Sequence, residues 1–118
     1  MGTSYYAVRK DGLKVQVAVF SSDTLSTMIG SERTTVDEWI KFLNSDTCVG
    51  LETESGSPVD IGDFVKRNLN KPSSPRQKKA VLATRHIFDS FEEGYAQKKG
   101  HPFYWTDKQI LFYNGVVF

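Results

Sequence analysis

Residues 5–20 read YYAVRKDGLKVQVAVF, and this stretch decides the fold. Two segments of alternating apolar and polar residues flank Asp11-Gly12, a pair that is preferred in two-residue type I′ hairpin turns. The spacing predicts an antiparallel hairpin in which Val8 faces Val15. Because side chains alternate along a strand, one face is expected to pack against the core. That core face carries Tyr6, Val8, Val15, Val17 and Val19.

The other face of this hairpin is expected to place Arg9 directly opposite Lys14. Like charges in facing positions disfavour strand pairing unless solvent or an anion relieves them. This face is therefore predicted to be either hydrated or occupied by a ligand. Arg9 and Lys14 are accordingly the first two candidate contact residues.

The segment Tyr5–Lys10, YYAVRK, resembles the opening of a small hybrid-binding domain. That domain occurs at the N-terminus of eukaryotic-type ribonuclease H and in caulimovirus viroplasmin. The resemblance implies a compact ββα unit that binds RNA–DNA hybrids. Asp11-Gly12 stands where that family has Gly-Arg, and Trp39 lies within a predicted helix instead of before it. No site residue is carried over. The same opening also resembles small bacterial and phage proteins of unassigned function.

Two helices are predicted in the middle of the chain. Thr35–Glu38 is a capping box, with acidic residues in the first turn, and an apolar stripe continues the helix to Asn44. Asp60 is expected to cap the second helix. The run 71–75, KPSSP, ends that helix because it contains two prolines.

A third, longer helix is predicted after this proline-rich elbow. Ser74 is its expected N-cap, with Pro75 in the first helical position. The helix is expected to run to about Lys99, with Gly100 as its C-cap.

The remaining segments are assigned to strands and connections. Ser21–Arg33 is rich in Ser, Thr and Gly and is predicted to be a loop, whereas Thr47–Thr53 alternates and is predicted to be a half-buried strand. Near the C-terminal end, Asn114-Gly115 is a second hairpin signal. The apolar residues 116–118 are expected to lie inside the sheet.

These elements predict one α+β domain, residues 1–118, because helices and strands come in runs instead of alternating. Its sheet is expected to be largely antiparallel, with five to six strands: an N-terminal hairpin, a C-terminal hairpin and a middle strand. About three helices pack against it. A chain of 118 residues can bury about two thirds of its surface, so no disulfide or metal is needed to stabilise the core.

The net charge of +1 conceals an uneven distribution. Residues 32–63 contain eight acidic and two basic side chains, whereas residues 64–88 contain seven basic and no acidic ones. Either the two segments neutralise each other across the fold or solvate two of its faces, or the basic segment binds phosphates or an acidic partner.

No catalytic or metal-binding constellation is recognised in the sequence. Cys48 has the pattern of a buried strand residue, and His86 and His101 have no ligand spacing with it. Asp60 and Asp63 are explained by helix capping. The sequence therefore gives no argument for an enzyme, a metal or another cofactor.

Two sets of side chains are candidates for contact with a partner. The first is basic and surrounds the proline-rich elbow. It consists of Lys66, Arg67, Arg76, Lys78, Lys79 and Arg85. The second is aromatic and lies near the C-terminal end, where alternating strands should leave part of a dense aromatic run outside the core. It consists of Tyr104, Trp105 and Tyr113.

These features predict a small non-enzymatic interaction protein, of accessory or inhibitor type, whose charged and aromatic surface binds another protein. By analogy, small accessory or inhibitor proteins of phages and mobile elements have similar features. The alternative is a nucleic-acid-binding module that uses the basic segment 66–85. A cytoplasmic location is expected from the single cysteine and the lack of a leader sequence, and no membrane contact is expected. Self-association is compatible with the same features.

Overall fold

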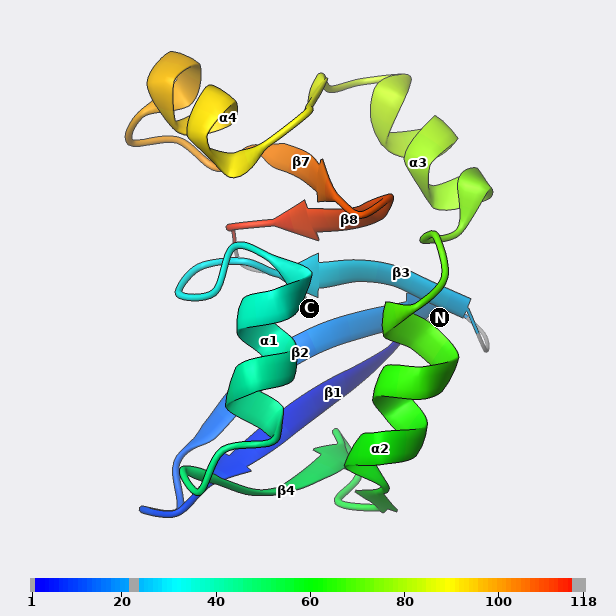
Figure 1. Cartoon of the computed structure of the whole chain (residues 1–118). Helices are drawn as coiled ribbons and strands as arrows, with labels where there is room; N and C mark the ends of the chain where they lie inside the picture. The colour runs from blue at the N-terminus through cyan, green and yellow to red at the C-terminus, as the bar shows by residue number, and fades with distance from the viewer. Residues whose placement is uncertain (1, 22–23, 116–118) are drawn as a thin grey trace.

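The computed structural model in Figure 1 describes residues 2–21 and 24–115, which form one mixed sheet with helices around it. The α+β class is confirmed. The strands are β1 (Gly2–Arg9), β2 (Lys14–Ser21), β3 (Thr24–Ile29), β4 (Cys48–Thr53), β5 (Pro58–Val59), β6 (Ile87–Phe88), β7 (Tyr104–Asp107) and β8 (Ile110–Tyr113). The helices are α1 (Val36–Leu43), α2 (Ile61–Phe64), α3 (Pro75–Leu82) and α4 (Phe91–Lys98), with a π-helical segment η1 (Val65–Leu69) continuing α2.

The sheet order is β5-β4-β1-β2-β3-β8-β7-β6. Five of the seven pairings between described strands are antiparallel, whereas β3–β8 and β6–β7 are parallel. The expected five to six strands and three helices are too few, since the described residues form eight strands and four α-helices. Helices α1 and α2 cover one face of the sheet, and α3 and α4 flank its β6–β8 end (Figure 1).

The N-terminal hairpin is confirmed, but its turn has three residues instead of two. The backbone N–H of Arg9 donates to the carbonyl of Leu13 at 2.8 Å, and Gly12 N–H donates to the Arg9 carbonyl at 2.9 Å. Gly12 has a φ of +89°, which a glycine adopts at little cost. A three-residue loop that closes on a left-handed glycine is the next most common hairpin connection.

This longer turn shifts the predicted register by one residue. Val8 faces Lys14, and Ala7 faces Val15. A shift of one residue moves each side chain to the opposite face of the sheet. Ala7 is therefore fully buried on the core face, whereas Tyr6 and Val8 are half-buried on the other face. The predicted core face was wrong for β1.

Strand β3 replaces the loop that was predicted over Ser21–Arg33. Its apolar residues Leu25 and Met28 are buried, and so are Ser26 and Thr27. β3 pairs with β2 on one edge and with β8 on the other, so that it lies inside the sheet. Local composition was misleading here because strand formation depends on neighbouring strands more than on intrinsic preference.

Helix α1 begins at the predicted capping box. The Thr35 hydroxyl accepts a hydrogen bond from the Glu38 N–H at 3.2 Å, and the Glu38 carboxylate accepts one from the Thr34 N–H. A further bond comes from a distant strand, since Val36 N–H donates to the Asp107 carboxylate at 2.8 Å. This end of α1 is thus fixed both locally and by β7.

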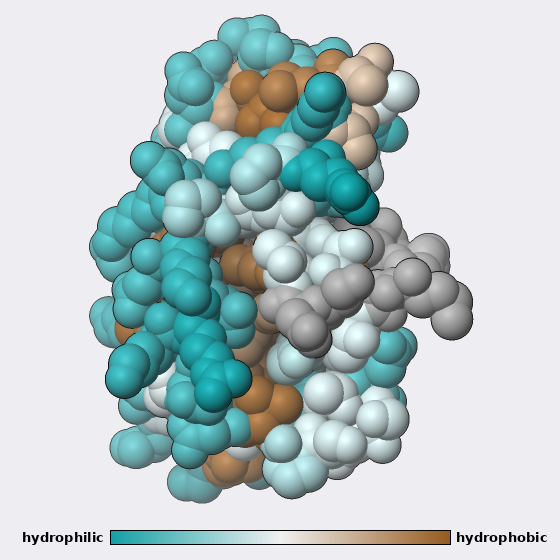
Figure 2. Space-filling model, turned by 90° about the vertical axis from the view of Figure 1, so that its right-hand side faces the viewer, coloured by the Kyte–Doolittle hydropathy of each residue, from teal (hydrophilic) through white to brown (hydrophobic). Residues whose placement is uncertain are grey.

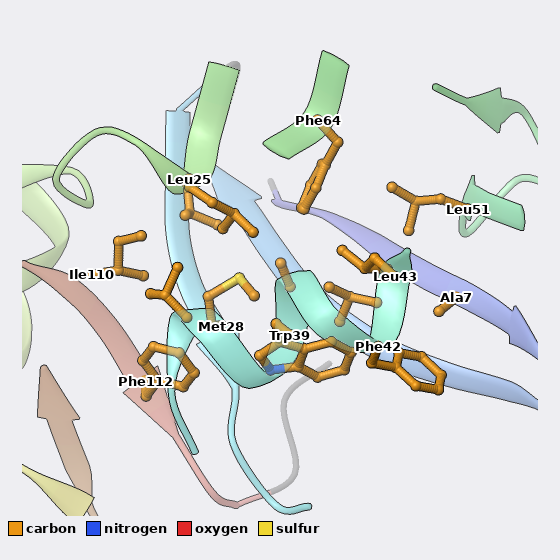
Figure 3. Close-up of a cluster of buried hydrophobic side chains, with 14 of the residues drawn as sticks. Ala7, Leu25, Met28, Trp39, Phe42, Leu43, Leu51, Phe64, Ile110 and Phe112 are labelled. Atoms are coloured by element: carbon orange, nitrogen blue, oxygen red, sulfur yellow. The ribbon is translucent and has the colours of Figure 1, made fainter. Parts of the chain in front are cut away.

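The main core lies between α1, α2 and the sheet (Figure 3). The Trp39 indole N–H donates to the carbonyl of Ile29 at 2.9 Å, which satisfies the one polar group of this large buried side chain. The core side chains labelled in the figure are Ala7, Leu25, Met28, Trp39, Phe42, Leu43, Leu51, Phe64, Ile110 and Phe112.

The predicted third helix is in fact two helices separated by a strand. Its start is confirmed, because the Ser74 hydroxyl accepts from the Gln77 N–H. α3 ends at Leu82, β6 then pairs with β7, and Ser90 caps α4 by accepting from the Glu93 N–H at 3.2 Å. The prediction of one continuous helix was wrong. The spacing of apolar residues indicated neither the N-cap at Ser90 nor the pairing of β6 with β7.

Near the C-terminal end, β7 and β8 form a hairpin whose turn, Lys108-Gln109, was not predicted. Both residues have positive φ, 50° and 66°, as a type I′ turn requires. Asn114 instead accepts a hydrogen bond from the Phe103 N–H at 2.8 Å. The predicted strand over 116–118 lies outside the described residues.

Within the described ranges, no helix has both the length and the apolar character needed to cross a bilayer.

Candidate functional site

The three aromatic candidates occupy different environments. Trp105 is fully buried, and its indole N–H donates to the Thr34 carbonyl at 3.0 Å. It is a core residue and presents no surface to a partner. Tyr104 and Tyr113 are half-buried on the opposite face of the same strands, with stacked rings 4.3 Å apart.

The Tyr104 hydroxyl lies in an environment that disfavours its anion. Burial raises the pKa of Tyr104, the nearby Tyr113 raises it further, and the positive charge of Arg85 partly offsets both effects. Tyr104 is therefore a neutral hydroxyl beside a basic side chain.

Arg9 and Lys14 are not a free basic pair. Arg9 lies 3.0 Å from the Asp11 carboxylate, and Lys14 forms an ion pair with Glu52. The predicted Arg9–Lys14 juxtaposition was wrong, because Lys14 faces Val8. Both residues flank the β1–β2 turn, at the end of the molecule opposite α3 (Figure 1). They do not join the basic segment in one site.

The basic segment extends along one side of the molecule, where η1 is followed by α3 (Figure 1). Among the residues that the structure describes, only Arg67 of this segment is ion-paired, with Asp63 at 3.5 Å. In the described part of the chain, this exposed pair is the one ion pair between the acidic and basic blocks. The basic candidates without such a pair are Lys66, Arg76, Lys78, Lys79 and Arg85.

Helix α3 combines these charges with an exposed aliphatic side chain. Leu82, the last residue of α3, is 59% exposed. Lys78 and Lys79 precede it by four and three positions, and these spacings place side chains next to one another on a helix. Figure 2 shows an apolar area at the upper end of the molecule, over α3, bordered by hydrophilic residues. We name Arg76, Lys78, Lys79 and Leu82 the α3 patch.

A cleft of about 520 Å³ is lined by the α3–β6 connection, β6, the last residue of α4 and the α4–β7 connection. Both histidines of the chain line it, although their spacing in the sequence is not that of metal ligands. Arg85 and Lys98 are on its wall, and Phe88 and Phe103 are at its base, each 3% exposed. The parallel pairing of β6 with β7 brings the two sides of the cleft together. No local sequence motif predicts that pairing.

Residues considered for catalysis have structural roles. Cys48 is buried, with its sulfur 3.3 Å from the Gly50 carbonyl oxygen. Asp60 caps α2 by accepting from the Asp63 N–H at 2.8 Å. In the part of the chain that the structure describes, no three Cys, His, Asp or Glu side chains are grouped as metal ligands would be.

No protein-family model, curated protein or solved structure matches this chain. The resemblance of Tyr5–Lys10 to the hybrid-binding domain is therefore not supported by a family match.

Proposed function

We propose that this protein is an accessory or inhibitor protein that binds an acidic surface of another protein through the α3 patch. The observation that carries the proposal is the 59% exposure of Leu82 beside Lys78 and Lys79. A partner that covers this patch gains apolar burial at Leu82 and charge complementarity around it.

This combination favours a protein over a nucleic acid. A phosphate backbone attracts the lysines but offers no apolar surface to Leu82. Protein interfaces, in contrast, have an apolar centre and a polar or charged rim. The segregation of charge supports the same choice, since an acidic partner would meet a side of the chain that lacks acidic residues from 64 to 88.

The test uses Leu82→Asp with Val49→Asp as its control. Val49 is 62% exposed, so the two variants lose matched aliphatic surface, but Val49 lies on β4 and outside the patch. Tagged wild-type protein and both variants are expressed in the source organism, and captured proteins are quantified by mass spectrometry. We expect one acidic protein to be lost by about 30-fold with Leu82→Asp and retained with Val49→Asp. Equal capture by all three proteins would contradict the proposal.

A second candidate is a nucleic-acid-binding module, which the unpaired basic residues between 66 and 85 favour. Its affinity should fall steeply with salt, because phosphate contacts release counterions. Fluorescence anisotropy with a labelled oligonucleotide at two salt concentrations tests it. Charge reversal of Lys78, Lys79 and Arg85 to Glu should abolish the binding, whereas Leu82→Ala should leave it unchanged.

A further inference from the structure

We propose that the cleft between α3, β6, α4 and β7 binds a small phosphomonoester that carries a flat ring. The cleft brings together Arg85 and His86, from the connection between α3 and β6, with Lys98, the last residue of α4, and His101, from the connection between α4 and β7. No carboxylate lines it. The inference does not rest on the proposed function, because it uses different side chains and a different kind of ligand.

The charges of the cleft favour an anion. Within the described residues, neither Arg85 nor Lys98 has a carboxylate within ion-pair distance. Arginine and lysine both bind phosphate oxygens, and each histidine ring offers an N–H donor. Four side chains, from the α3–β6 connection, the last residue of α4 and the α4–β7 connection, therefore line one concave surface that has no carboxylate among its lining residues.

The C-terminal ends of α3 and α4 do not cancel this attraction. A helix C-terminus carries a partial negative charge, which disfavours anions. Here its carbonyls are engaged, since Val81 O accepts from Arg85 N–H at 2.7 Å and Lys98 O accepts from His101 N–H at 2.9 Å. The full positive charges of Arg85 and Lys98 therefore dominate the field in the cleft.

The base of the cleft suits a ring. Phe88 and Phe103 lie with their rings 5.8 Å apart, and the His86 ring is held 4.5 Å from Phe88 in an edge-on arrangement. Pro102 adds a further apolar surface. A volume of about 520 Å³ is in the range of small-molecule sites. A phosphate at the wall and a flat ring on this base would use both parts of the cleft.

Phenyl phosphate and inorganic phosphate test the proposal in calorimetric titrations of the full chain. We expect both to bind saturably, with phenyl phosphate tighter by about three-fold or more because its ring packs on the aromatic base. Lys98→Gln and Arg85→Gln should each weaken phenyl phosphate binding by about ten-fold. Both side chains are exposed, so thermal unfolding of the variants should match the wild type and show that they are folded.

Lys99→Gln is the matched control, since Lys99 is the next residue along the chain and does not line the cleft. It should change the binding constant by less than about two-fold. Leu82→Ala should also leave phenyl phosphate binding unchanged, which separates this proposal from the α3 patch. Absence of saturable binding, equal affinity for the two anions, or equal losses with Lys98→Gln and Lys99→Gln would each overturn the proposal.

Discussion

The backbone of Gly30 lies directly against the indole ring of Trp105. A Cβ atom at position 30 would be 2.4 Å from two carbons of that ring. The ring cannot move aside easily, because Trp105 is fully buried and its N–H is bonded to the Thr34 carbonyl. Trp105, which was expected to be an exposed contact residue, is thus a buried and immobile side chain. The backbone that follows β3 packs against it.

Gly30→Ala should destabilise the protein by about 1–3 kcal/mol, because the added methyl group overpacks the core against Trp105. Chemical denaturation followed by tryptophan fluorescence measures the change. Gly50→Ala is the control, since no atom lies within 4 Å of a Cβ placed there. Similar unfolding free energies for the two variants would show that the Trp105 ring leaves room for a methyl group at position 30.

Ser73→Ala should cost about 1–3 kcal/mol of stability. Ser73 is fully buried, and its hydroxyl oxygen accepts from the Leu111 N–H at 2.9 Å. Alanine leaves that buried N–H without its partner. Thermal unfolding compares this variant with Ser31→Ala, which alters an exposed serine and should shift the midpoint little. An unchanged midpoint for Ser73→Ala would contradict the assigned role of the hydroxyl.

Gln109→Gly should stabilise the β7–β8 turn by up to about 1 kcal/mol. Gln109 has a φ of 66°, which costs a side-chain-bearing residue more than it costs glycine. The carbonyl of residue 109, which accepts from Ser73 N–H, is kept. Gln77→Gly, within α3, should instead lower the unfolding free energy by about 1 kcal/mol. Urea denaturation of both variants checks the opposite signs, and a loss of stability at position 109 would refute this interpretation.

Tyr104 should be among the last tyrosines to ionise as the pH rises. Its pKa is raised chiefly by burial, so the folded state holds the phenolic proton more tightly than the unfolded state does. The contribution of Tyr104 to stability is thus complete below the ordinary tyrosine pKa, about 10, and is lost above it. Absorbance at 295 nm measures the titration. Tyr104→Phe should remove a late step that Tyr95→Phe leaves in place; its persistence in Tyr104→Phe would disprove the assignment.

Local signals in the sequence predicted the starts of three of the four described α-helices. Thr35, Asp60 and Ser74 are N-caps as predicted, because a capping bond joins residues only three positions apart. The hairpin at Asp11-Gly12 was predicted for the same reason, although its loop is one residue longer. Its register was not predicted, since both turn types begin with similar residues and differ only in where pairing starts.

The candidate site was predicted only in part. The basic character of residues 66–85 is a property of composition, and Arg85 was among the predicted residues. The cleft was missed because His86 and His101 meet only when β6 pairs with β7. Trp105 was placed on the surface because neighbouring aromatic residues do not indicate which face of a strand is covered.

Amino-acid order alone determined the α+β class, the starts of α1, α2 and α3 and the separation of charge, since each follows from residue type or from neighbours a few positions apart. Three-dimensional packing decided the position of β3, the division of the long helix and the face that each aromatic ring occupies. Those outcomes depend on contacts between segments that are distant in the sequence, such as β3 with β8. The free energy of such contacts cannot be inferred from a short stretch of the chain.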